Sequence, residues 1–203
     1  IRHTIQLSDS LTRTGRFHEA ARVLESLEEM DQEAAQRWRG RRCQLFLMAG
    51  DLRRFEASVG PLPLRARVPL ADLLAPYHPQ RAESLLVDAD DKWAELVSTR
   101  LLSQYNDDRQ IQAARRQLET CIQKNADDTP EWKTAIALAE AEILEALGEM
   151  AASQQKLEYG LSIVEPDPGL LAWTRLRLNR ARCALSRGLI TQARSAARTL
   201  LLE

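Results

Sequence analysis

The sequence of 203 residues has no long apolar run and few of the residues that build or punctuate β-sheets. No stretch approaches the roughly 18 apolar residues that a membrane span requires, so this segment is not expected to insert into a membrane. Gly and Pro occur only eight times each, and β-branched residues are scarce, which argues against a sheet protein with closely spaced turns. Ala, Leu, Arg, Glu and Gln predominate instead, and these residues favour helix.

Cysteine is also rare. Cys43, Cys121 and Cys183 are widely spaced, each within an apolar helical stretch, and no CxxC pair occurs. An odd number of cysteines at such spacing argues against a disulfide framework and against a zinc site. We expect three buried thiols, which favours a reducing, cytoplasmic compartment and leaves the periplasm open as an alternative.

Signatures of catalysis are missing from the sequence. It contains no Gly-rich phosphate loop, no GxSxG elbow and no HExxH motif. The histidines are isolated from other ligand-type residues at helical spacing (His3, His18 and His78), so neither a metal nor a cofactor is expected. Glu140, Glu142 and Glu145 fit a solvated helix, on which Glu142 and Glu145 share one face. The sequence therefore predicts a protein that is not an enzyme.

The charge balance is close to neutral. A net charge of −1 gives no overall attraction to nucleic acid or to an anionic membrane. Nucleic-acid binding would also call for aromatic residues interleaved with basic ones, and the sequence does not provide them. Arg greatly outnumbers Lys, which is typical of a GC-rich bacterial genome. The chain opens at Ile1 without Met and ends at Glu203 within a helical pattern, so we expect a segment of a larger protein.

Internal repetition is the main signal that the sequence does contain. A Gly that ends one helix is followed after two residues by an apolar residue that opens the next helix, a pattern typical of helix–turn–helix pairs. This sequence pattern occurs at Gly15, Gly50, Gly148 and Gly188, and a version without Gly occurs around Asn106. Each occurrence predicts the turn within one helix pair.

Tryptophan gives a second, independent measure of the repeat. Trp93, Trp132 and Trp173 each lie near the start of a predicted first helix and are 39 and 41 residues apart. Gly148 and Gly188 are 40 residues apart. Two unrelated markers therefore agree on a period near 40 residues.

The pattern resembles the tetratricopeptide repeat (TPR) family. That family has a small residue midway along the first helix, matched here by Ser8, Cys43, Ala141 and Ala181, a Gly-containing turn, and an Ala early in the second helix, matched by Ala20, Ala114 and Ala193. The sequence departs from the family at Phe55 and Ser153, which replace that Ala, at Gly40 near the start of a first helix, and in its longer period. The resemblance implies an all-α fold: a right-handed superhelical stack of antiparallel helix pairs, a TPR-like α-solenoid of about five units.

The predicted organisation has three parts. Residues 1–59 would hold two helix pairs, and residues 93–203 would hold three. Residues 60–92 contain five prolines, so they are expected to form either an irregular, proline-rich connector or a degenerate repeat. Within them, short helical turns are predicted at residues 70–75 and 80–87.

The charged residues of the first helices suggest a contact surface. In the repeat family this face looks into a concave groove, and the positions that share its phase are Arg37, Gln44, Glu142, Glu145, Arg175 and Arg182. Residues 169–202 contain seven Arg and no acidic residue. This basic stretch would either capture an acidic segment of a partner or cover apolar surface with its Arg stems.

The resulting hypothesis is a protein–protein interaction scaffold that binds a peptide or protein partner in its concave groove. Two alternatives remain open. One is the sensor region of a large bacterial transcription activator. The other is a periplasmic scaffold of a secretion or exopolysaccharide export apparatus.

Overall fold

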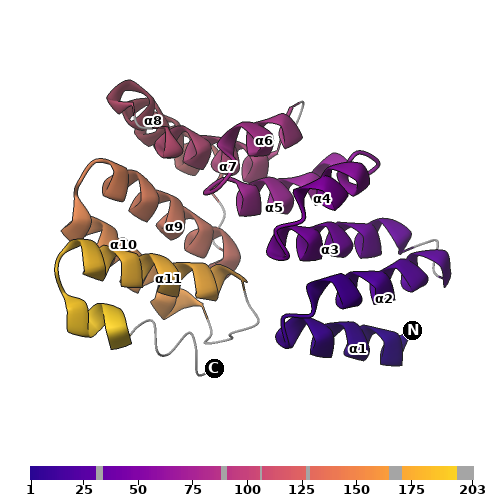
Figure 1. The fold of residues 1–203 in the computed structure, drawn as a ribbon. Helices are drawn as coiled ribbons and strands as arrows, with labels where there is room; N and C mark the ends of the chain where they lie inside the picture. The colour runs from indigo at the N-terminus through magenta and orange to yellow at the C-terminus, as the bar shows by residue number, and fades with distance from the viewer. Residues whose placement is uncertain (31–33, 88–90, 106, 127–128, 165–170, 196–203) are drawn as a thin grey trace. The chain divides into compact units, whose positions relative to one another are not determined.

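The computed structural model describes residues 1–30, 34–87, 91–105, 107–126, 129–164 and 171–195, and only the backbone of residues 30 and 171–174. These residues form helices joined by short turns, and no strand occurs among them (Figure 1). Helix accounts for most of these described residues, and consecutive helices pack against each other in pairs. The expected all-α class built from helix pairs is therefore confirmed.

The chain divides into two compact units, residues 1–90 and 91–203. Unit 1 contains α1 (Arg2–Arg13), α2 (Phe17–Met30), α3 (Ala35–Met48), α4 (Leu52–Val59), α5 (Leu64–Leu74) and α6 (Pro79–Leu85). Each of these helices packs against the next within the pairs α1–α2, α3–α4 and α5–α6. Successive pairs are joined where α3 packs against both α2 and α5.

Unit 2 contains α7 (Lys92–Gln104), α8 (Asp108–Lys124), α9 (Pro130–Ala146), α10 (Met150–Ile163) and α11 (Leu171–Ser186). A further helical segment begins at Ile190 and is described as far as Ser195. Within the pairs, α7 packs on α8 and α9 on α10. The first helices also contact one another directly, because α9 packs against both α7 and α11. Residues on this row of first helices can therefore interact from one pair to the next.

The four predicted glycine turns share one geometry. Gly15, Gly50, Gly148 and Gly188 have φ angles of 73°, 70°, 78° and 72°. At the first turn, the backbone N–H of Arg16 donates to the carbonyl of Leu11 at 2.9 Å, and that of Gly15 donates to Thr12 at 3.0 Å. This is the Schellman pattern, and its positive φ favours glycine over residues with a Cβ. The repeated sequence pattern thus forms the same helix C-cap at each of the four turns.

The proline-rich segment contains more helix than its composition suggests. Helix α5 begins at Leu64, six residues before the predicted turn, and runs through Pro69. A proline at this position removes one backbone hydrogen bond. The helix nevertheless buries Val68, Leu70, Ala71 and Leu74, and this packing favours the helix despite the missing bond. Helix α6 then packs back on α5 to form a pair.

The small residues that the repeat pattern places at helix crossings are mostly buried. Ser8, Cys43, Ala141, Ala20, Ala114 and Ala193 are all at most 9% exposed, and Ala181 is half-buried. All three cysteines are buried and free, as expected. Burial raises the pKa of the Cys43 thiol to about 11. Burial likewise raises the pKa of Cys121 and of Cys183, which disfavours the reactive thiolate form.

Gly160 marks a tight three-helix contact that the sequence does not reveal. It lies on α10, where a Cβ would be 2.9 Å from Cδ2 of Leu176 on α11 and 3.3 Å from Cβ of Ala137 on α9. Leu176 and Ala137 are themselves fully buried. The absence of a side chain at Gly160 therefore allows α9, α10 and α11 to approach closely.

We expect Gly160→Ala to lower the free energy of unfolding by about 1 kcal/mol, because overpacking costs about 1–3 kcal/mol and exceeds the helix-propensity gain of about 1 kcal/mol. Gly60 is the matched control, since it also has helical dihedral angles and a Cβ there meets no atom within 4 Å. Gly60→Ala is expected to leave stability unchanged or raise it by about 0.4–1 kcal/mol. Urea denaturation followed by circular dichroism measures both. Equal stabilities for the two variants would contradict the close approach.

Candidate functional site

A buried ion pair links two first helices of unit 2. Arg100 on α7 donates from Nε to Oε2 of Glu142 on α9 and from Nη2 to Oε1 of the same carboxylate, both at 2.8 Å. The two side chains are only 5% and 10% exposed. This is the bidentate geometry in which a guanidinium binds a carboxylate most strongly. This ion pair therefore connects the helix pair α7–α8 to the helix pair α9–α10 through their first helices.

The network continues onto α11. Asn179 donates from Nδ2 to Oε1 of Glu142 at 3.3 Å. Arg182 donates to Oδ1 of Asn179 at 3.5 Å and to Oε1 of Glu145 at 3.3 Å. A row of polar contacts therefore joins α7, α9 and α11. In unit 1, Arg41 on α3 likewise pairs with Asp9 on α1.

The structure brings three of the six predicted contact residues together, namely Glu142, Glu145 and Arg182. Arg175 is half-buried on α11, with interactions of its own. Arg37 and Gln44 lie on α3 in unit 1, where Arg37 is exposed and Gln44 is half-buried. Glu142 and Glu145 are thus paired within the chain, with Arg100 and Arg182 respectively. None of this tests whether a partner contacts them, so the six positions stay a prediction.

Sequence reasoning missed the partners Arg100 and Asn179. Arg100 precedes Glu142 by 42 residues and Asn179 follows it by 37. Both separations are close to one repeat. The sequence did contain one indication of this contact. Arg100 stands alone among apolar residues of α7, and a carboxylate follows it after about one repeat length.

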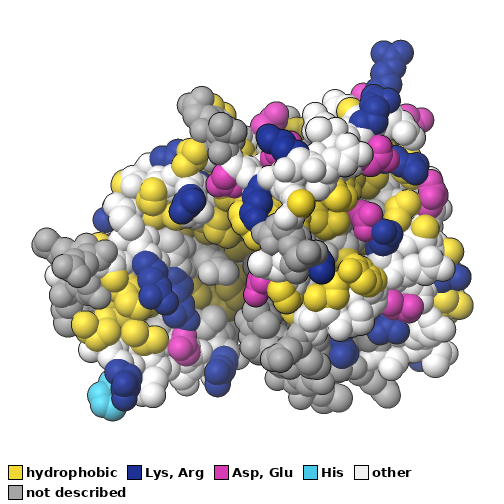
Figure 2. Space-filling model, turned by 180° about the vertical axis from the view of Figure 1, so that it is seen from behind, with side chains coloured by type: hydrophobic (Ala, Val, Ile, Leu, Met, Phe, Trp, Pro, Cys, Tyr) yellow, Lys and Arg dark blue, Asp and Glu magenta, His cyan; other side chains and the backbone are white. Residues whose placement is uncertain are grey.

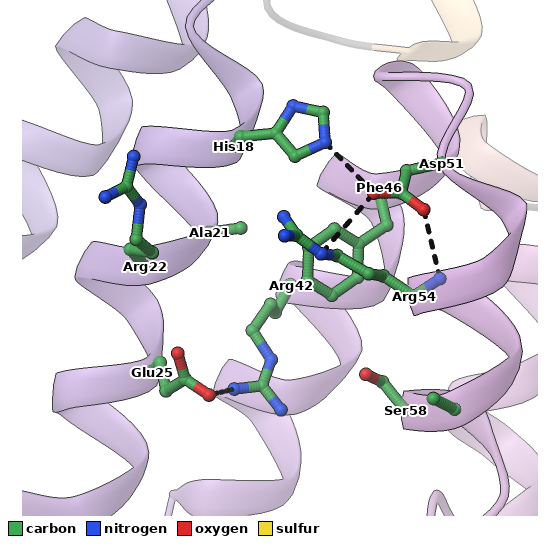
Figure 3. A pocket seen from close by; sticks show the side chains of 10 residues that line it. His18, Ala21, Arg22, Glu25, Arg42, Phe46, Asp51, Arg54 and Ser58 are labelled. Atoms are coloured by element: carbon green, nitrogen blue, oxygen red, sulfur yellow. Dashed lines mark hydrogen bonds and ion pairs between the residues drawn. The ribbon is translucent and has the colours of Figure 1, made fainter.

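A separate feature of unit 1 is an open pocket between α2, α3 and α4, shown in Figure 3. Its cavity volume is about 740 Å³. Seven of its ten lining residues are polar or charged. The lining residues are His18, Ala21, Arg22, Glu25, Arg42, Phe46, Asp51, Arg54, Ala57 and Ser58.

Asp51 organises one side of this pocket. It caps α4 by accepting the backbone N–H of Arg54 at 3.1 Å, and its other oxygen lies 3.1 Å from Nε2 of His18 on α2. Nε of Arg54 lies 3.6 Å from the same carboxylate. The backbone hydrogen bond, followed by the His18 contact, lowers the pKa of Asp51. Asp51 therefore remains ionised at neutral pH and holds α2 and α4 together at this point.

The other lining carboxylate is also engaged. Arg42 on α3 lies 2.9 Å from Glu25 and 3.3 Å from Glu28, both on α2. By contrast, the exposed guanidinium group of Arg22 makes no hydrogen bond or ion pair among the described residues, and that of Arg54 is engaged only by the 3.6 Å contact with Asp51. The pocket therefore offers to a ligand the guanidinium group of Arg22, and that of Arg54 apart from its contact with Asp51.

Among the described pocket side chains, His18 and Ser58 do not form a nucleophile–base pair. His18 and Asp51 contact each other, but in the described part of the chain no hydrogen bond joins Ser58 to His18, so the serine has no base beside it. Within the same described ranges, no cluster of three His, Cys, Asp or Glu side chains is placed to hold a metal. None of the described helices is long and apolar enough to cross a membrane.

Comparison with protein-family models, with curated protein sequences and with solved structures gives no match. Function must therefore be argued from the side chains themselves. On the face shown in Figure 2, basic and acidic side chains are interspersed and do not form one basic field.

Proposed function

We propose that this chain is a protein–protein interaction scaffold built from helix pairs of the tetratricopeptide type, stacked as an α-solenoid. The observation that carries the proposal is the open pocket between α2, α3 and α4, where two exposed arginines stand on a framework of packed helices. Stacked helix pairs present a long surface to a partner while each pair supports only its neighbours. Such a surface suits a peptide or a folded protein better than a small apolar ligand.

The chemistry of the pocket supports a polar segment of a partner as the ligand. Small-molecule pockets are lined mainly by apolar side chains, whereas here only Ala21, Phe46 and Ala57 are apolar. Phe46 is itself largely buried, so it offers little contact area. Arg22 and Arg54 are exposed, and arginine is a residue type that commonly anchors protein interfaces.

The predicted groove is retained as a second contact surface of the same scaffold. Arg182 keeps 59% of its side chain exposed although it pairs with Glu145. Glu142 is almost enclosed by Arg100 and Asn179, so we assign it to the framework that supports the groove. Arg182 is then the groove residue with the clearest role in partner contact, and Arg175 is retained beside it as a predicted contact residue.

Affinity capture with the full chain as bait, followed by reconstitution with each purified candidate, tests the scaffold role. We expect a protein that binds the purified chain in a defined stoichiometry. Its affinity should fall at least about tenfold on charge reversal of one of the two surfaces, either by Arg22→Glu with Arg54→Glu or by Arg175→Glu with Arg182→Glu.

Arg13→Glu with Arg53→Glu changes the net charge equally at exposed positions outside both surfaces and is the control. Circular dichroism must show the same helix content for every variant. A complex whose affinity none of the surface variants changes would remove the assignment, as would the absence of any protein that binds the purified chain.

A further inference from the structure

We infer that the pocket between α2, α3 and α4 binds the carboxylate groups of an acidic peptide segment, with Arg22 and Arg54 as the residues that contact them. The inference deepens the proposed function and rests on it in one respect, since the peptide would belong to the partner protein. The recognition chemistry itself depends only on the pocket.

Charge is the first argument. The lining contains Arg22, Arg42 and Arg54 against Glu25 and Asp51, and Arg42 also pairs with Glu28 of α2 at 3.3 Å. Arg42 neutralises Glu25 at 2.9 Å. Asp51 accepts the backbone N–H of Arg54, contacts His18 and lies 3.6 Å from Nε of Arg54. An entering carboxylate therefore meets guanidinium donors, and the acidic groups near it are already paired.

The position of the two arginines is the second argument. Arg22 projects from α2 and Arg54 from α4, so they stand on different helices that border the cavity (Figure 3). The side chain of Arg54 is 60% exposed and can turn toward a ligand. Ala21 and Ala57 also line the pocket, and their small side chains leave room for a peptide backbone. Two arginines on separate helices favour a segment with more than one carboxylate over a single small anion.

The lining also discriminates between acidic ligands. A single-stranded nucleic acid would need an aromatic platform, and the one aromatic residue of the lining, Phe46, is only 8% exposed. An acidic peptide therefore fits this lining better than a single-stranded nucleic acid.

The test is fluorescence anisotropy of a labelled hexaglutamate peptide titrated with the full chain at low salt. We expect hexaglutamate to bind, hexaglutamine not to bind, and the affinity for hexaglutamate to fall as salt is raised. Arg22→Gln with Arg54→Gln should weaken binding at least about tenfold. The matched control, Arg13→Gln with Arg53→Gln, removes the same two charges from exposed positions on α1 and α4 outside the pocket and should change the affinity less than about twofold.

Three outcomes would overturn the inference: no binding of hexaglutamate, an equal loss in the pocket and control variants, or tighter binding of a single-stranded DNA oligomer than of hexaglutamate. These results are separable from the scaffold role. A partner protein whose binding the pocket variant does not alter leaves the scaffold in place and rejects the carboxylate site. Hexaglutamate binding that depends on Arg22 and Arg54, without any partner protein, supports the site and rejects the scaffold.

Discussion

Replacing Arg100 by Met is expected to lower the free energy of unfolding by about 3–5 kcal/mol, because removal of one partner leaves the other buried without its counter-charge. Among the described residues, Glu142 would keep only its hydrogen bond from Asn179, and its side chain is 10% exposed. Glu142→Leu is expected to be as harmful, since the guanidinium of Arg100 would then lose the carboxylate that accepts two of its donors.

The double variant Arg100→Met with Glu142→Leu separates the cost of an unpaired charge from the worth of the pair. A buried ion pair replaced by apolar residues of similar size is often neutral in stability. Asn179 would still lose its acceptor, so we expect the free energy of unfolding of the double variant to be about 1–3 kcal/mol below that of the wild type. The result we look for is that the double variant is more stable than either single variant.

Urea denaturation monitored by circular dichroism gives these differences, provided that the slope of the transition stays constant. Lys124→Gln is the control. Lys124 on α8 pairs at 3.4 Å with Glu95, which lies on α7 as Arg100 does, and 64% of the Lys124 side chain is exposed. This substitution should cost less than about 1 kcal/mol. An Arg100 variant no less stable than the Lys124 variant would show that the buried pair does not join α7 to α9 as the structure indicates.

Phe55→Ala is expected to cost about 3–5 kcal/mol, because it removes a large buried side chain and leaves a cavity in unit 1. The repeat resemblance alone implies the opposite, since Ala is the residue that the family has at this position of the second helix. In the structure Phe55 is 2% exposed and is among the largest fully buried side chains. The packing around α4 therefore accommodates the volume of a Phe side chain, and Ala, the residue that the repeat family has here, would be too small to fill the space.

The same denaturation measurement applies, with Tyr77→Ala as control. Tyr77 also lies in unit 1, and 73% of its surface is exposed, so loss of its ring should change stability by less than about 0.5 kcal/mol. A Phe55→Ala variant as stable as the wild type would mean that α4 closes onto the smaller residue. Partial collapse would give an intermediate loss and a change in the packing of α3 against α4.

The contrast between Phe55 and the turn glycines explains how much of the fold could be predicted from the sequence, and the same reason applies to the candidate site. A left-handed C-cap depends on a few consecutive residues, so Gly15 and Gly148 were found from local sequence. The volume available at Phe55 depends on helices that approach from elsewhere in the chain. His18 and Asp51 show the same limit. They are 33 residues apart and carry no motif, yet together they form one side of the pocket.

The sequence by itself determined the helical class, the helix-pair turns and the starts of the first helices at Trp93 and Trp132, because helical periodicity and positive φ are local properties. The tertiary structure alone decided that Glu142 is held by Arg100, that α5 continues through Pro69, and that arginines gather around a pocket between α2, α3 and α4. These features depend on how distant helices pack, since packing selects the buried neighbours of each side chain and can outweigh the local preference of a residue such as proline.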